Sequence, residues 1–399
     1  MRTLFASLFF FAVPLAAQSP LAVGIRDVSL PNTTGQGSAN LTARVHYPAA
    51  VAGTNAAVLP RTGGWPVVVF LHGFAAVGNN YAPVGNALAS SGFIAVMSNT
   101  MQFDNQGQEY DGRALYTALV AANASSASPF FGALDMSNAG LLGHSMGGGN
   151  VGNVLSNNPG YQCGFGMAPV TPRGSNAAAV RVPMGIVVGQ GDSIAPAATY
   201  AQPYYASLTG YDDAKSYYLM NNECTHLNVC AFSLGSATDN AVFARSMAIT
   251  LGWFDRWLRN GPLGLDAVFG PAPRGDARLV SASQQFVAPQ VFASGLFAVG
   301  QTTRLSVAAE AGFAGVGFAS SLAPALPTPF GDLLLDAQTA ALQWSGFTGS
   351  GTSAQRFDVA VAVPVDPVFA GLPFAVQALG VERTGALRLG NALAFTVAP

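Results

Sequence analysis

The chain has 399 residues, half of them hydrophobic, and only 9% are Asp, Glu, Lys or Arg, against roughly 25% in an average soluble protein. This apolar content argues against intrinsic disorder, and a formal net charge of -2 without a basic run argues against nucleic acid as a partner. Because a single core seldom grows beyond roughly 250–300 residues, the length predicts two domains.

The first 18 residues have the pattern of a cleaved export signal. Arg2 gives a positive start, residues 4–15 are almost uninterruptedly apolar, and Ala16 and Ala17 offer small residues for cleavage. An apolar run of about twelve residues is too short to span a bilayer. We therefore expect residues 1–18 to be a signal peptide and the mature protein to be secreted, periplasmic or on the cell surface, without integral membrane contact.

Residues 22–262 alternate between apolar runs of strand length and segments compatible with helices. This order predicts an α/β domain with a mostly parallel sheet and helices on both faces. The expected strands are 42–47, 66–71, 93–98, 139–143, 164–167, 184–188 and 216–220, and the expected helices lie near 79–91, 110–123, 146–156, 197–208 and 239–259.

The last of these helices has the clearest local signals. Asp239 is the expected N-cap, because a carboxylate there can accept from the first free N–H groups. Five apolar residues recur at helical spacing and predict a face that packs into the core, namely Phe243, Met247, Leu251, Phe254 and Leu258.

The character of the chain changes after residue 262. Residues 263–275 are rich in Gly and Pro and predict a linker. From 276 to 399, short runs alternate apolar with small or polar residues, and prolines separate them. This pattern predicts an antiparallel, sandwich-like, β-rich accessory domain. It contains no His and no Cys, so we expect no catalytic residues there.

The strongest chemical signal is the segment Gly143-His144-Ser145-Met146-Gly147, which follows an apolar strand and precedes a helix-compatible stretch. In the α/β-hydrolase fold, G-x-S-x-G in this context projects a serine nucleophile from a sharp strand-to-helix turn. The turn is so tight that it leaves no room for a Cβ at the two glycine positions. The alternative is an incidental serine in a glycine-rich loop. The context favours Ser145 as a nucleophile.

A serine nucleophile needs a base, and the chain has only four histidines. His144 adjoins the nucleophile and should point away from it, while His46 and His72 precede it. Since the base follows the nucleophile and the acid in α/β-hydrolases, His226 is the expected base.

The acid that orients His226 should lie between the nucleophile and the base. Asp192 follows an apolar run and a glycine-containing turn, which places it on a loop after a strand. We expect it to be the acid. Asp212 and Asp213, in a turn, and Glu223 are the alternatives.

Two backbone N–H groups should receive the oxyanion. One is expected from Met146, directly after the nucleophile, and the other from Phe74, which follows an early apolar strand and His72-Gly73. The ring of Phe74 would either line the acyl pocket or cap the core. We expect no metal, because the histidines are dispersed along the sequence, and no cofactor, because the sequence has no nucleotide-binding loop.

The three cysteines allow at most one intramolecular disulfide. Cys224 and Cys230 bracket His226 closely enough to close a short loop, and an oxidising compartment would permit the bond. We expect these two to be bridged and Cys163, in an apolar run, to be a buried thiol. The two pairings that involve Cys163 are the alternatives.

Residues 22–262 resemble the secreted α/β-hydrolases that group bacterial cutinases and PET-type polyester hydrolases with chlorophyllase-like esterases. The matching segments are Val45-His46-Tyr47-Pro48, Leu71-His72-Gly73-Phe74, residues 143–149 and Asp192-Ser193-Ile194-Ala195-Pro196. The resemblance implies the same triad and the same two oxyanion donors, and it implies that His144, Arg173 and Ile194 lie near the substrate pocket.

One segment departs from the family pattern. Polyester hydrolases usually carry a substrate-clamping Trp after Ala-Pro-x-x-Pro, whereas this chain has Arg173 after residues 168–172. This change does not affect the residues expected to hydrolyse the ester. It argues against a polyester or cutin as the substrate.

The expected function is a secreted, monomeric serine esterase that forms an acyl-enzyme on hydrophobic esters, aromatic polyesters among them. The alternatives are a lipase or phospholipase-like acylhydrolase and a surface-binding protein whose β-domain is the functional part. No long insertion that could form a lid separates Ser145 from His226, which ranks the lipase lower.

Overall fold

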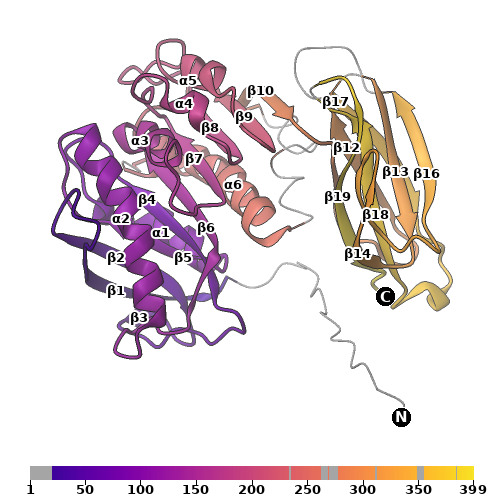
Figure 1. Ribbon diagram of the computed structural model, residues 1–399, viewed down its shortest axis with the longest axis horizontal. Coiled ribbons are helices and arrows are strands. Elements are labelled where there is room, and N and C mark those ends of the chain that lie inside the picture. The colour runs from indigo at the N-terminus through magenta and orange to yellow at the C-terminus, as the bar shows by residue number, and fades with distance from the viewer. Residues whose placement is uncertain are drawn as a thin grey trace.

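A computed structural model describes residues 20–232, 235–261, 268, 277–310, 312–347, 355–382 and 384–399. The expected signal peptide and, apart from residue 268, the expected linker lie outside the described residues. The large sheet has ten strands in the order β10-β9-β8-β7-β6-β4-β5-β2-β1-β3 (Figure 1). The strands are β1 (Ala22–Pro31), β2 (Asn40–Ala49), β3 (Gly53–Thr54), β4 (Trp65–Leu71), β5 (Ile94–Ser98), β6 (Leu134–His144), β7 (Cys163–Met167), β8 (Met184–Gly189), β9 (Ala214–Met220) and β10 (Leu279–Phe286).

The centre of this sheet is parallel, from β5 through β4, β6, β7 and β8 to β9. Antiparallel strands flank it: β2 pairs with β5, and β10 pairs with β9. The helical elements are η1 (Gly78–Tyr81), α1 (Ala82–Ser90), α2 (Asn105–Ala124), α3 (Met146–Leu155), α4 (Asn176–Ala179), α5 (Ala201–Ser207), η2 (Asn228–Cys230) and α6 (Ala237–Arg259).

Helices cover both faces of the sheet because the side chains of its strands alternate between two cores. In β4, Val68 and Phe70 belong to the core shared with α1 and α6. Val67 and Val69 belong to the core shared with α2, α3 and α5. This arrangement agrees with the expected mostly parallel sheet, and the expected apolar face of α6 does pack into the first core.

Two helices begin earlier than the sequence predicts. The N-cap of α6 is Ser236, and Asp239 is the N3 residue of a capping box, in which it accepts from the Ser236 N–H at 3.0 Å. The helix therefore begins earlier than a single capping carboxylate suggested. Helix α2 likewise begins at Asn105, capped by Asp104.

The strand β10 corrects the expected start of the accessory domain. Residues 279–286 were expected to belong to that domain, but they form the edge strand of the large sheet, antiparallel to β9. Phe286 is buried in the core that α1 and α6 share. Period-two patterning predicts a strand without saying which sheet it joins.

The remaining strands form separate antiparallel sheets. One contains β11 (Gln290–Ala293), β12 (Thr302–Ala309) and β17 (Gln355–Ala362); another contains β13 (Phe313–Ala319), β16 (Ala341–Phe347), β18 (Pro373–Val381) and β19 (Leu387–Thr396); β14 (Leu322–Thr328) pairs with β15 (Gly331–Leu335), and η3 spans Pro367–Phe369. One hydrophobic cluster takes Val291 and Leu305 from the first of these sheets and Val316 and Leu393 from the second. The two sheets therefore share a core.

Candidate active site

Ser145 lies at the turn between β6 and α3, in a backbone conformation that residues other than glycine rarely adopt. Its φ is 56° and its ψ is -117°, and such strain persists only where the surrounding structure holds it. A Cβ on Gly143 or Gly147 would come within 3.0 Å of the Gly147 or Leu71 carbonyl oxygen, respectively. The expectation that both positions leave no room for a side chain is confirmed.

His226 and Asp192 meet at the same edge of the sheet as Ser145, since they follow β9 and β8 and the three strands are parallel. Nδ1 of His226 lies 2.7 Å from Oδ2 of Asp192. The other carboxylate oxygen accepts from the N–H groups of Ile194 at 3.0 Å and Ala195 at 2.7 Å. With both side chains buried, the contact fixes the ring and leaves Nε2 as the nitrogen that can take a proton.

The other candidate acids lie elsewhere. Asp212 and Asp213 precede β9 and so lie at the opposite end of that strand from His226. Glu223 is ion-paired with Arg278 at 3.3 Å. Of the four carboxylates that the sequence left open, only Asp192 has a hydrogen bond to His226 among the described residues.

The two expected oxyanion donors come from different elements. Met146 is the first residue of α3, where N–H groups have no carbonyl partner within the helix. Phe74 follows β4, and among the described residues its N–H donates to no backbone carbonyl. A Cβ built on the neighbouring Gly73 would lie 3.4 Å from Cβ of Ser145, so this loop passes directly beside the serine.

The ring of Phe74 does not cap the core. It is 63% exposed and packs edge to face against Phe103, which is 60% exposed, with ring centroids 5.8 Å apart. Ile194 is also exposed, beside Asp192. The loops that follow β4, β5 and β8 therefore each expose an apolar side chain.

His144 lies buried behind the serine. Its Nε2 is 2.8 Å from the carbonyl oxygen of His226, and its Nδ1 is 3.0 Å from the hydroxyl of Tyr81. Burial, with a smaller contribution from His226, lowers the pKa of His144 to about 3. His144 is therefore neutral and does not face the substrate side. Tyr81 was not singled out by any sequence signal.

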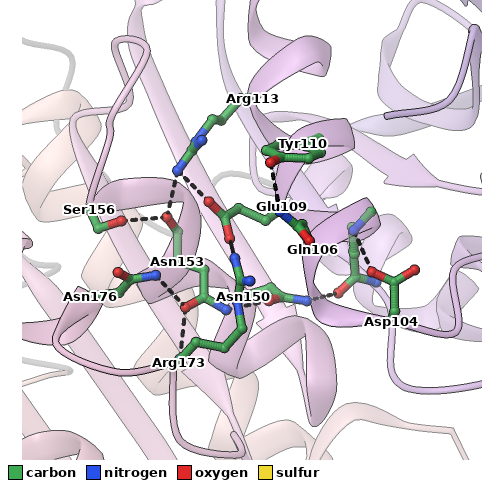
Figure 2. Close-up of polar contacts among 12 residues, drawn as sticks. Asp104, Gln106, Glu109, Tyr110, Arg113, Asn150, Asn153, Ser156, Arg173 and Asn176 are labelled. Carbon is green, nitrogen blue, oxygen red and sulfur yellow. Dashed lines mark hydrogen bonds and ion pairs between the residues drawn. The ribbon is translucent and has the colours of Figure 1, made fainter. Parts of the chain in front are cut away.

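Arg173 is bound by a network of polar side chains on α2 and α3. Figure 2 shows its guanidinium paired with Glu109, which also binds Arg113. The backbone N–H of Arg173 donates to Oδ1 of Asn153 at 2.9 Å. Glu109 lies in α2, so this ion pair holds the guanidinium of Arg173 against that helix.

A buried chain of amides runs from this network to the loop after β4. Asn153 donates to Asn150 at 2.5 Å (Figure 2), and Asn150 donates to the side-chain oxygen of Gln108 at 2.8 Å. Gln108 in turn donates to the carbonyl of His72 at 2.8 Å. These residues support the loop that carries Phe74. The sequence did not single them out, because isolated polar residues within helical segments form no recognisable pattern.

The expected disulfide is wrong, because Cys163, Cys224 and Cys230 are all free and buried. The thiol of Cys230 lies in η2 and donates to the carbonyl of Leu227 at 3.5 Å. Burial raises the pKa of Cys224 to about 12, so this thiol is protonated and unreactive. Proximity in sequence did not bring the two sulfurs into bonding geometry.

No group of three or more His, Cys, Asp or Glu side chains in the described ranges could hold a metal ion. The described part of the chain also has no helix that is long and apolar enough to cross a membrane.

Comparisons with known proteins agree with this geometry. The PET hydrolase-like family matches residues 12–277. The chain is 29% identical over 245 residues to a bis(hydroxyethyl) terephthalate hydrolase of Streptomyces coelicolor, covering 61% of this chain and 69% of the relative. It is 28% identical over 197 residues to cutinase 1 of Thermobifida cellulosilytica, covering 48% and 67%, and to a cutinase of Thermobifida fusca, covering 48% and 58%. The chain thus belongs to the PET hydrolase-like family and is a hydrolase of carboxylic esters.

Proposed function

We propose that the chain cleaves hydrophobic esters through an acyl-enzyme formed on Ser145. Oγ of Ser145 attacks the ester carbonyl while Nε2 of His226 takes its proton, and Asp192 stabilises the resulting imidazolium. The amides of Phe74 and Met146 donate to the oxyanion. His226 then protonates the departing alcohol. In the second half, His226 activates a water that releases the acid from Ser145.

The contact between His226 and Asp192 carries this proposal. It occupies Nδ1 at 2.7 Å and directs Nε2 of the base away from the acid, at the edge of the sheet where the strained serine lies. The backbone strain at Ser145 supports a functional role, because such conformations cluster at active sites, ligand clamps and switch regions.

We propose a hydrophobic, aromatic diester or polyester as the substrate class. Phe74, Phe103 and Ile194 are each at least 60% exposed, and exposed apolar groups around a reactive serine favour an apolar ligand. The relatives named as cutinases and as a bis(hydroxyethyl) terephthalate hydrolase support this class. Arg173, which stands where polyester hydrolases usually carry a clamping Trp, is paired with Glu109 and therefore does not supply an apolar ring for the substrate.

We also propose that the protein is exported and that residues 1–18 are cleaved off during export. The charged start, the apolar run and the small residues before Gln18 support this proposal. N-terminal sequencing of the protein recovered outside the cytoplasm of the expressing cells tests it, and an intact N-terminus there would contradict it.

The mechanism is tested with a serine-directed phosphonate and a p-nitrophenyl ester. Ser145→Ala should lower kcat by about 10³-fold or more and abolish labelling. Ser90→Ala is the matched control, because Ser90 lies at the end of α1 and donates only to the Ala87 carbonyl. Substantial turnover by the Ser145 variant, or labelling of another residue, would refute the mechanism.

The substrate class is tested by comparing an aromatic diester, an amorphous polyester film, cutin and a long-chain triglyceride. We expect release of product from the aromatic substrates. Preference for the triglyceride would favour the lipase alternative instead.

A further inference from the structure

A chain of buried hydrogen bonds joins the two loops that the proposed reaction must hold in register. Its members are the Gly73 N–H, the Tyr81 hydroxyl, the His144 ring and the His226 carbonyl. The separations are 3.0 Å from Gly73 to Tyr81, 3.0 Å from Tyr81 to His144 and 2.8 Å from His144 to His226. The side chains of Tyr81 and His144 are both buried, at 1% and 2% exposure.

The chemistry of the two ends fixes the direction of every bond. The His226 carbonyl can only accept, so Nε2 of His144 carries a proton. Because His144 is neutral, its Nδ1 accepts, and the Tyr81 hydroxyl must donate to it. The same hydroxyl oxygen accepts from the N–H of Gly73. Every donor therefore meets one acceptor, and no member can be removed without leaving a buried partner unpaired.

The two ends of this chain belong to the proposed machinery. Gly73 immediately precedes Phe74, so fixing the Gly73 amide orients the peptide that presents the Phe74 N–H. At the other end, His144 donates to the backbone carbonyl of His226 and so fixes the backbone there, while Asp192 fixes the ring of His226.

Packing holds the same groups together. A Cβ on Gly73 would lie 3.0 Å from Oη of Tyr81 and 3.2 Å from Nδ1 of His144. The rings of His144 and His226 are 4.7 Å apart between centroids, and those of Tyr81 and His144 are 5.5 Å apart.

We propose that Tyr81 and His144 are positioning residues that lock the oxyanion-binding amide of Phe74 to the backbone of the base His226. The inference rests on the proposed function, because it assigns a purpose to residues that act through Phe74 and His226. Neither side chain contacts the substrate. Their loss should therefore slow acylation of Ser145 and leave substrate binding unchanged.

Tyr81→Phe tests the proposal, since it keeps the ring and removes only the hydroxyl. We expect kcat for a soluble p-nitrophenyl ester and the rate of phosphonate labelling to fall about 10- to 100-fold, with KM changed less than about twofold. His144→Phe should lower both rates at least as much. His144→Gln, whose amide can still donate to the His226 carbonyl, should recover part of that loss.

The double variant with Tyr81→Phe and His144→Phe should be no slower than the slower single variant, because both changes break one chain.

Tyr161→Phe is the matched control. Tyr161 is fully buried and donates to the Gly112 carbonyl at 2.8 Å, and it belongs to the other of the two cores that flank the sheet. It should lower stability without changing kcat. Circular dichroism is used to check that each variant folds.

Two results would overturn the proposal. One is a Tyr81→Phe enzyme whose kcat stays within twofold of the wild type while its stability falls as in the Tyr161 control. The other is full additivity of the Tyr81 and His144 substitutions. Ser145→Ala distinguishes failure of the proposed function from failure of this inference. If the Ser145 variant stays active, the proposed function is wrong. If the Ser145 variant is inactive and the Tyr81 variant is unimpaired, only this inference is wrong.

Discussion

Replacing Asp192 by Asn tests the proposed division of labour between acid and base most directly. The carboxylate accepts three N–H groups, from His226, Ile194 and Ala195. An asparagine oxygen can keep the two backbone bonds, and its NH₂ group then faces Nδ1 of His226. The ring must therefore carry its proton on Nε2, the nitrogen that should take the proton of Ser145.

The wrong tautomer should lower kcat by about 10³- to 10⁴-fold, which corresponds to about 4–5.5 kcal/mol at 1.36 kcal/mol per decade. The assay is the steady-state hydrolysis of a soluble p-nitrophenyl ester, with circular dichroism to verify folding. Asp111→Asn is the matched control, because Asp111 is a buried carboxylate that also accepts three bonds, from the N–H and hydroxyl of Ser38 and from Gln102.

We expect the Asp111 variant to lose stability and keep its kcat. If the Asp192 variant retains kcat within tenfold of the wild type while the labelling of Ser145 continues at the normal rate, then Asp192 does not set the tautomer of His226. The reasoning from the 2.7 Å contact would then be refuted.

Three further predictions follow from the fold and the surroundings of the site. Truncation after residue 262 deletes β10 and uncovers the edge of β9, so it should lower Tm by roughly 10 °C or more, whereas truncation after residue 288 keeps the strand and should cost much less. Because burial lowers the pKa of His144 to about 3 while the unfolded chain binds that proton near pH 6.5, the free energy of unfolding should fall as pH drops from about 6.5 towards 3, by up to about 1.4 kcal/mol per pH unit. His144→Gln should give a shallower slope in denaturant titrations over that range. Phe103→Ala removes the ring that packs on Phe74 and should weaken adsorption to polyester film about two- to tenfold, with turnover of a short soluble ester unchanged.

Each of these has an outcome that contradicts it. Equal Tm values for the two truncations would mean that β10 contributes little to the sheet. An unchanged pH slope in the His144 variant would mean that another group governs acid unfolding. Phe131→Ala, at a residue that is 58% exposed in the loop before β6, is the control for Phe103, and equal loss of adsorption in both variants would argue for general surface hydrophobicity.

The sequence alone determined those features whose information is local. The turn at Ser145 is specified by glycines within two residues of it, since a Cβ at either position would collide with a backbone carbonyl. The alternation of apolar runs predicted the parallel centre of the sheet, because period and length are properties of each segment. Chain order and the scarcity of histidine then predicted the base, His226, that the structure pairs with Asp192.

The tertiary structure alone decided what depends on residues distant in the chain. Tyr81 meets His144 across 63 positions, and Arg173 meets Glu109 across 64, so neither partner carries a mark that a local pattern could detect. The same holds for β10, whose pairing with β9 depends on which sheet edge lies open, and for Cys224 and Cys230, whose spacing allowed a bond that the fold does not contain. Patterns of residue type fix which groups are present and roughly where each element begins. Their partners are fixed by packing, which must give the buried polar groups of the whole fold their hydrogen bonds at once.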